Sequence, residues 1–146
     1  MTVTSFTSFV LAFVALSVFP TCRSNNGSSF VDRRDSDAVL QAYFAAWNRN
    51  DTVSQKSFMT ASYSDTDWYG EPVDSITVVS AKRLDEKSAR LWSTGAPDVT
   101  RVYLVVFDYS PHGRGFSMEP GRYPWTYILT WDAARASWLI SSYGAG

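Results

Sequence analysis

The spacing of apolar residues changes once along the chain, from a helical pattern to an alternating one. Between Asp35 and Asn48, apolar side chains recur every three or four residues, at Val39, Leu40, Tyr43, Phe44, Ala46 and Trp47. This periodicity predicts an amphipathic helix. Asp35 or Ser36 is suited to cap its start, because short polar side chains accept hydrogen bonds from the first free backbone N–H groups. We expect Phe44 and Trp47 to be buried.

A second, shorter helix is predicted directly after the first. The segment Asn48-Arg-Asn-Asp51 interrupts the apolar repeat, and Asp51 or Thr52 then offers a new cap. The following segment carries a narrow apolar face made of Val53, Phe58 and Met59. The chain therefore starts its folded part with two helices.

From Tyr63 onward the apolar positions alternate, which predicts β-strands. The expected strands cover residues 73–81, 101–109, 123–131 and 137–143, with a hairpin loop at 132–136. Residues 82–91 fit either an exposed strand or a helical turn, and residues 92–98 fit a loop. Both faces of 101–109 are apolar, so we expect that strand to be central and covered on both sides.

The strand 123–131 has one strongly aromatic face. Trp125, Tyr127, Leu129 and Trp131 share this face with Tyr123, whereas Thr126, Ile128 and Thr130 occupy the other. We expect the aromatic face to be the concave one. Helices followed by a run of antiparallel strands indicate an α+β fold. The expected architecture is a curved antiparallel sheet of about four to six strands around the N-terminal helices.

An apolar run close to the N-terminus predicts export. Residues 9–19 are apolar except for Ser17, and Cys22 follows them. The run is about half of the roughly 20 residues that a bilayer-spanning helix needs, and it has the length of a signal-peptide core. We therefore expect an extracytoplasmic protein, either secreted or attached to a membrane.

Cys22 is the only cysteine, so it has no partner for an internal disulfide. Its place directly after the apolar run suggests that it carries a lipid as the new N-terminus of a bacterial lipoprotein. An intermolecular disulfide, a cleaved soluble protein and an uncleaved N-terminal anchor are the alternatives. The predicted division is a signal peptide over residues 1–22, a flexible Gly/Ser/Asn-rich linker over 23–34 and a single domain over 35–146.

Charge and composition narrow the possible functions. The formal net charge is −1, which argues against nucleic-acid binding, because that requires a basic surface. With one cysteine and one histidine, His112, a Cys/His zinc site is not expected, and we predict neither a metal nor a cofactor. His112 lies in Ser110-Pro-His-Gly-Arg-Gly115, which favours an exposed loop over a catalytic triad.

Aromatic residues make up 16% of the chain, and all Trp and Tyr residues lie beyond the apolar run. Most of them are expected to form the core, because each buries a large area. Tyr and Trp also carry polar tips, so a cavity lined by them is able to orient a ligand. The expected ligand-pocket residues are Tyr43, Trp47, Tyr63, Tyr103, Trp125, Tyr127 and Trp131.

The order of segments resembles the nuclear transport factor 2-like fold, in which a curved sheet forms a cone around a helix. The matching segments are Val39-Leu-Gln-Ala-Tyr-Phe-Ala-Ala-Trp-Asn-Arg-Asn-Asp51 and the closing Trp138-Leu-Ile-Ser-Ser-Tyr-Gly144. More narrowly, the chain resembles an uncharacterised family of bacterial extracytoplasmic domains with this cystatin-like cone, and this resemblance implies a lipoprotein. The resemblance covers roughly residues 36–146 and implies fold and location, not chemistry.

The same resemblance implies an enzymatic alternative. Some members of the wider fold are isomerases or dehydratases whose cavity holds an acid beside tyrosines. Here Asp108 is the candidate, because it shares a strand face with Val102, Leu104 and Val106. An apolar interior would raise its pKa, whereas a position at the strand end would leave it solvated. Asp65 and Asp67 fit a turn better.

Three readings of function follow from the sequence. The leading one is a non-catalytic extracytoplasmic domain that binds a small apolar ligand or a protein partner. The second is a small-molecule isomerase or hydratase that uses Asp108. The third is a structural accessory domain that forms a homodimer through its sheet.

Overall fold

The computed structural model describes residues 31–64, 71–113 and 118–145. Its longest helix, α1 (Ser36–Asn48), begins where the sequence predicts, because the side chain of Asp35 accepts a hydrogen bond from the backbone N–H of Asp37. The apolar repeat places the predicted residues on one buried face. Phe44 and Trp47 are both buried, as expected.

Among the described residues, three shorter helices accompany α1. The expected second helix is α2 (Thr52–Ser57), and the side chain of Asp51 caps it by accepting from the N–H of Ser54. α3 (Ala61–Ser64) and α4 (Glu86–Ala89) are single turns, too short to give a periodic signal. α4 resolves the ambiguous segment 82–91, which ends a strand and then turns into a helix.

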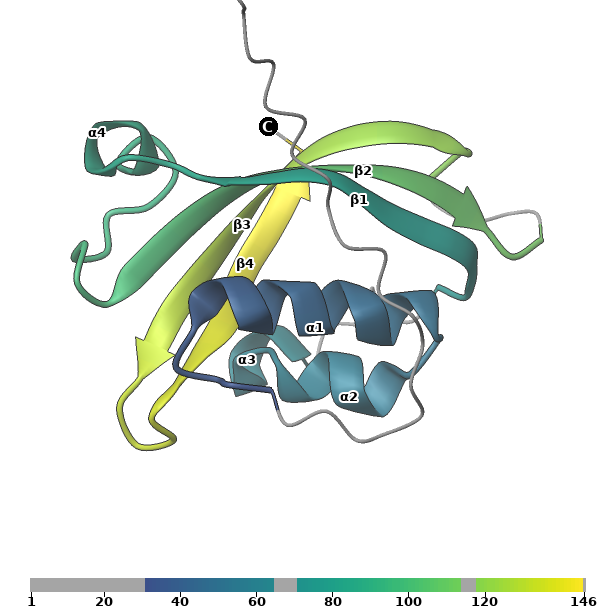
Figure 1. Cartoon of the computed structure of the whole chain (residues 1–146). Coiled ribbons are helices and arrows are strands. Elements are labelled where there is room, and N and C mark those ends of the chain that lie inside the picture. Colours follow the sequence, from purple (N-terminus) through teal and green to yellow (C-terminus); the bar gives the residue numbers. More distant parts are fainter. Residues whose placement is uncertain (1–30, 65–70, 114–117, 146) are drawn as a thin grey trace, which may run out of the picture.

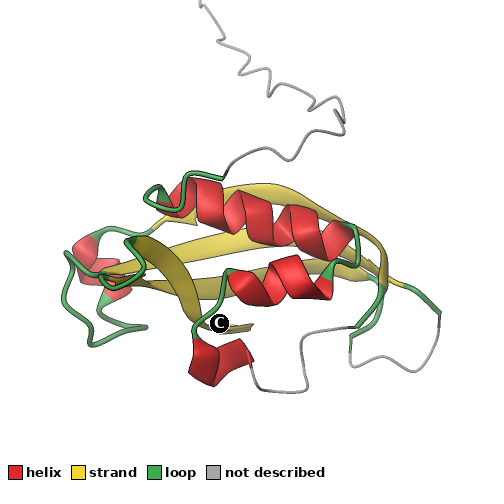
Figure 2. Ribbon diagram, turned by 90° about the horizontal axis from the view of Figure 1, so that it is seen from below, coloured by secondary structure: helices red, strands yellow, loops and turns green. Residues whose placement is uncertain are grey.

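The sheet has four antiparallel strands in the order β1-β2-β3-β4. They are β1 (Val73–Arg83), β2 (Thr100–Pro111), β3 (Gly121–Asp132) and β4 (Ser137–Ala145). Helices α1, α2 and α3 lie on one face of this sheet (Figures 1 and 2). The predicted α+β class and the antiparallel sheet are therefore confirmed. The sheet is open, because β1 and β4 stay at opposite edges.

The aromatic face of β3 packs toward the helices, as predicted. Trp125 and Tyr127 are buried, and Tyr127 lies opposite Tyr103 of β2. Thr126 and Ile128 lie on the other face. The expectation that both faces of β2 are covered holds only in part, because Leu104 on the outer face is exposed.

The two edges of the sheet differ in the hydrogen bonds that their backbone N–H and C=O groups form. Along β4, Ile140 donates to Phe58 O and accepts from Thr60 N, so the edge is covered. At the start of β1, the side chains of Asn48 and Asn50 bind the backbone of Ile76 and Val73. From Thr77 to Arg83, the described residues offer the outer edge of β1 no such partner.

Arg33 and Arg34, at the end of the expected linker, already belong to the packed structure. The backbone carbonyl of Arg33 accepts from Trp138 N, and that of Arg34 accepts from Trp138 Nε1. The expected domain boundary at residue 35 remains a prediction. The expected signal peptide, Cys22, Asp65 and Asp67 lie outside the described residues. Within the described residues, no helix has the length and hydrophobicity to cross a membrane.

Candidate functional site

The connection between β1 and β2 folds into a cleft at one end of the sheet. α4 lies within this connection and stands apart from the helical layer formed by α1, α2 and α3 (Figure 1). Asp85 caps α4 by accepting from the N–H and the hydroxyl of Ser88, and these hydrogen bonds lower the pKa of its carboxyl group. The chain then turns back tightly, with Ser93 N donating to Ala89 O. This local structure fixes one wall of the cleft.

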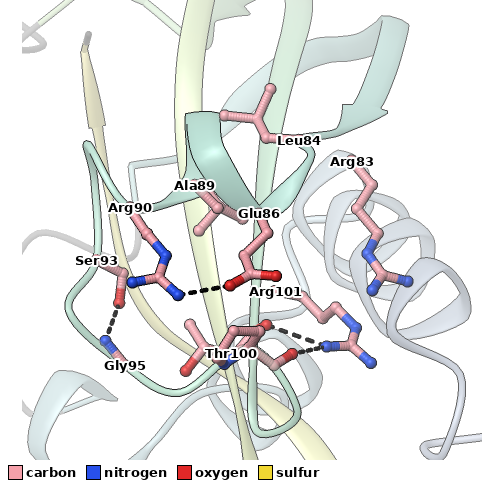
Figure 3. Close-up of a pocket in the computed structure, with 11 residues that line it drawn as sticks. Arg83, Leu84, Glu86, Ala89, Arg90, Ser93, Gly95, Thr100 and Arg101 are labelled. Atoms are coloured by element: carbon pink, nitrogen blue, oxygen red, sulfur yellow. Dashed lines mark hydrogen bonds and ion pairs between the residues drawn. The ribbon is translucent and has the colours of Figure 1, made fainter.

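The cleft has a volume of about 200 Å³. Its lining residues come from the end of β1, from α4 and the loop after it, and from the start of β2 (Figure 3): Arg83, Leu84, Glu86, Ala89, Arg90, Ser93, Gly95, Pro97, Thr100, Arg101 and Val102. Gly95 approaches Thr100 so closely that a Cβ at this position would collide with the threonine hydroxyl. We call this cleft the α4 cleft.

Two arginines meet in the α4 cleft because of the strand register. Arg83 pairs with Tyr103 across β1 and β2, and Arg101 precedes Tyr103 by two residues on the same strand face. Such diagonal cross-strand neighbours lie within reach of long side chains. Figure 3 shows both guanidinium groups extending to the same side of the cleft.

Contacts hold the guanidinium group of Arg101 in place. It donates to the backbone carbonyls of Pro97 and Thr100 and lies over the ring of Trp138, 4.8 Å from the centroid. Burial lowers the pKa of Arg101, and the nearby charge of Arg83 lowers it further. The two guanidinium groups carry like charges and repel each other. A negative group placed between them would therefore be stabilised by both.

The other charged lining residues form an ion pair. Arg90 Nη2 lies 2.5 Å from Glu86 Oε1, one helical turn earlier. Arg83 forms no ion pair with any described residue. The α4 cleft therefore has an excess of positive charge, although the whole chain is slightly acidic. Guanidinium groups are planar multiple donors that match carboxylate and phosphate oxygens.

The polar groups of the α4 cleft are guanidinium groups, hydroxyls and the carboxylate of Glu86. Its hydroxyls come from Ser93 and Thr100, and its lining includes neither a histidine nor a cysteine. Within residues 31–64, 71–113 and 118–145, no group of three or more His, Cys, Asp or Glu side chains is placed to hold a metal. The arrangement of guanidinium groups suits the recognition of an anion.

The residues predicted from the sequence to line a ligand pocket lie together in the core between α1 and the sheet. Tyr43, Trp47, Tyr103, Trp125 and Tyr127 are buried, whereas Tyr63 and Trp131 are partly exposed. The rings of Tyr43, Trp47, Trp125 and Tyr127 contact each other directly. For example, the ring centroids of Tyr43 and Tyr127 are 6.0 Å apart. A ligand-binding role for these residues stays a prediction.

The environment of Asp108 is the opposite of what an isomerase acid requires. Its strand face points away from the helices, and its carboxylate forms hydrogen bonds of 2.7 and 2.9 Å with the guanidinium of Arg122. These interactions lower the pKa of Asp108. Of the two positions that the sequence leaves open for Asp108, the structure shows the solvated one and not the apolar interior with a raised pKa. His112 is exposed, as expected, and its Nδ1 lies 2.6 Å from Asp74 Oδ1.

Sequence reasoning did not identify the α4 cleft. The charges of residues 82–91 are evident in the sequence, but they fit any exposed strand or turn. Arg101 is separated from Arg83 by a long connection, and only the β1–β2 register brings the two together. The available signal was the repetition of basic residues on both sides of a predicted loop.

Comparison with known proteins corrects the family expectation. No family model matches the chain, and no curated protein matches its sequence. The structure is similar to the solution structure of a SEC-C motif containing protein from Rhodopseudomonas palustris, with a TM-score of 0.50 and 12% sequence identity. The match covers 78% of this chain and 80% of that chain. At this identity the likeness shows the fold alone.

The resemblance to the nuclear transport factor 2-like cone and to its extracytoplasmic family is therefore wrong. The structural neighbour shares an open four-stranded antiparallel sheet instead. The motif at the end of α1 does not identify the family, because its residues form local hydrogen bonds. Asn48 binds the N–H of Ile76, and Asp51 caps α2. Any helix that is followed by a second helix and a strand benefits from such residues.

Proposed function

We propose that this protein is a non-catalytic binding domain whose α4 cleft binds a small ligand with a carboxylate or phosphate group. The observation that carries the proposal is the convergence of Arg83 and Arg101 in one cleft whose one described lining carboxylate, that of Glu86, is paired with Arg90. Hydrogen bonds from guanidinium groups to such anions are charge-assisted and stronger than neutral ones.

The two arginines have different roles in the proposed site. Arg101 is fixed by two carbonyls and by Trp138, so little conformational entropy is lost when it binds a ligand. Arg83 is exposed and able to adapt to the ligand. Arg90 is paired with Glu86, so its charge is largely neutralised and the excess positive charge comes from Arg83 and Arg101.

A ligand that binds only the folded state raises the melting temperature. We expect inorganic phosphate to raise the melting temperature of the full chain more than sodium chloride does at equal ionic strength. The double variant Arg83→Gln/Arg101→Gln should lose this difference, whereas Arg49→Gln, which removes an exposed arginine far from the cleft, should keep it. Equal effects of phosphate and chloride on the unmodified protein would contradict the proposal.

The geometry gives less support to an apolar ligand in the core and to the isomerase or hydratase reading. An apolar ligand in the core would have to separate rings that already contact each other, such as Phe107 and Trp125, whose centroids are 5.3 Å apart. The isomerase or hydratase reading loses its acid, because Asp108 lies on the outer face, paired with Arg122.

Association through the sheet is a second candidate function, supported by a separate observation. The outer edge of β1 from Thr77 to Arg83 is open among the described residues, and Val78 and Val79 on this strand are exposed. An open edge strand is a template for pairing with another chain. A homodimer formed in this way should dissociate in Val79→Lys, as measured by sedimentation velocity. A monomeric unmodified protein would reject it.

The extracytoplasmic location also remains a proposal, supported by the apolar run at residues 9–19 and by Cys22. In this account the domain is secreted, or attached to a membrane through an N-terminal lipid.

A further inference from the structure

Two large apolar side chains are exposed beside the α4 cleft. Leu91 is 83% exposed and Trp92 is 42% exposed. They lie between Arg90 and Ser93, which both line the cleft. Backbone hydrogen bonds from Leu91 N to Ser88 O and from Trp92 N to Ala89 O fix this turn. The two side chains thus project from an ordered turn next to a site for anions.

Basic residues gather around the same turn. The segment 82–101 contains Lys82, Arg83, Lys87, Arg90 and Arg101, against Asp85, Glu86 and Asp98. The segment is therefore positive, while the chain as a whole is slightly negative. In Figure 1, α4 and the loop after it extend beyond the end of the sheet. The exposed apolar side chains of Leu91 and Trp92 and the positively charged residues therefore lie at the same end of the molecule.

We propose that this end of the domain docks on a membrane surface that contains anionic phospholipids. Leu91 and Trp92 enter the interface between headgroups and acyl chains, while Arg83 and Arg101 bind a lipid phosphate in the α4 cleft. The inference rests on the proposed anion-binding function and names the source of the anion. Trp and Leu side chains favour this interface, and basic residues add electrostatic attraction to anionic lipids.

The shape of the turn agrees with this mode of binding. Leu91 and Trp92 are adjacent and both exposed, so they form a small apolar patch beside the basic residues of the same connection. Trp has an apolar body and a polar N–H, which suits it to a boundary between water and lipid. The contribution of the basic side chains should weaken with salt, because exposed charges are screened.

Vesicle sedimentation tests the inference with the full chain. The protein is mixed with vesicles of phosphatidylcholine alone or with vesicles in which phosphatidylserine replaces part of it. Residues 1–30 are the same in every variant, and the neutral vesicles report their contribution. The test variant is Leu91→Ser/Trp92→Ser. The matched control is Val53→Ser, because Val53 on α2 is also 83% exposed but lies elsewhere.

We expect preferential binding to the anionic vesicles, reduced about tenfold or more in Leu91→Ser/Trp92→Ser and in Arg83→Gln/Arg101→Gln. Val53→Ser should bind like the unmodified protein. The Leu91→Ser/Trp92→Ser variant should keep its thermal response to inorganic phosphate, which shows that its cleft is intact.

Failure of this inference and failure of the proposed function give different results. A phosphate response without preference for anionic vesicles would overturn membrane docking and leave a soluble anion as the ligand. Undiminished vesicle binding by Leu91→Ser/Trp92→Ser would also overturn it. Absence of the phosphate response in the unmodified protein would remove the anion site on which the inference rests.

Discussion

The side-chain amide of Asn50 binds both backbone polar groups of Val73. Asn50 Nδ2 donates to Val73 O at 3.0 Å, and Val73 N donates to Asn50 Oδ1 at 2.7 Å. The Asn50 side chain thereby provides the pair of hydrogen bonds that a neighbouring strand would form with the start of β1. It also has a φ of 55°, a left-handed conformation that Asn tolerates better than most residues. One residue thus ends the helical segment and anchors the sheet.

Replacing Asn50 should therefore destabilise the fold in two separable ways. Asn50→Ala loses two hydrogen bonds and places alanine in the left-handed region, which it tolerates less well than asparagine, so the free energy of unfolding should fall by about 2–3 kcal/mol. Asn50→Gly keeps the conformation accessible and loses only the hydrogen bonds, so it should cost less. Urea unfolding measures both. Equal stability of Asn50→Ala and the unmodified protein would show that the amide contacts do not support β1.

Trp47 should contribute strongly to stability because it packs in the aromatic core. Its ring centroid lies 6.1 Å from the ring centroids of Phe44 and Phe107, and only 7% of the residue is exposed. Trp47→Ala should cost about 3–5 kcal/mol. The matched control is Trp92→Ala, which removes an exposed ring and should change the melting temperature little. Similar losses in both variants would mean that Trp47 has no special role in the core.

The fold was predictable where local pattern and burial agree. Asp35, Asp51 and the aromatic face around Trp125 lie as the sequence indicates, because capping and alternation are local rules. Asp108 illustrates the limit. Its strand face is apolar in sequence, but sequence alone does not state which face the helices cover, and Arg122 on the next strand decides its electrostatic environment.

The candidate site was not predictable for a related reason. Arg83 and Arg101 become neighbours only through the pairing of β1 with β2 around the long connection that contains α4. Conversely, the motif around Asn48 suggested the wrong family, because its capping and edge-binding roles recur in many α+β folds. Local chemistry thus predicts elements better than it predicts sites or families.

Tyr103 should make the stability of the domain fall at high pH. Burial raises the pKa of its phenol to about 12, although a hydrogen bond of 2.7 Å with Ser36 Oγ acts in the opposite direction. Because the folded-state pKa is above the ordinary value of 10.0, this stabilisation is present below pH 10 and is lost as the pH rises toward 12.

Urea unfolding at several alkaline pH values measures this effect. In Tyr103→Phe the decline between about pH 10 and 12 should be smaller than in the unmodified protein. Tyr109, whose pKa is likewise raised to about 12 by burial and by Glu71, should sustain part of the decline in both proteins. Identical pH profiles would show that Tyr103 does not titrate as a buried group.

The proposed export should depend on the apolar run at residues 9–19. A charge in its centre, as in Ala15→Arg, opposes insertion into an apolar environment, so the precursor should accumulate inside the cell. Fractionation of expressing cells measures this. Normal secretion of Ala15→Arg would contradict the signal-peptide prediction.

Lipidation is tested separately by metabolic labelling with a fatty-acid analogue. The label should be present in the unmodified protein and absent from Cys22→Ser. A label that persists in the variant, or that never appears, would reject Cys22 as the lipid attachment site.

Binding of an anion by Arg83 and Arg101 is the central claim, and nuclear magnetic resonance tests it most directly. In a titration of the labelled full chain with inorganic phosphate, the side-chain Nε–H signals of Arg83 and Arg101 should shift with one common saturation curve, while that of Arg49 should stay in place. A sodium chloride titration at equal ionic strength serves as the control. Equal, non-saturating shifts of all three arginines would contradict a specific anion site in the α4 cleft.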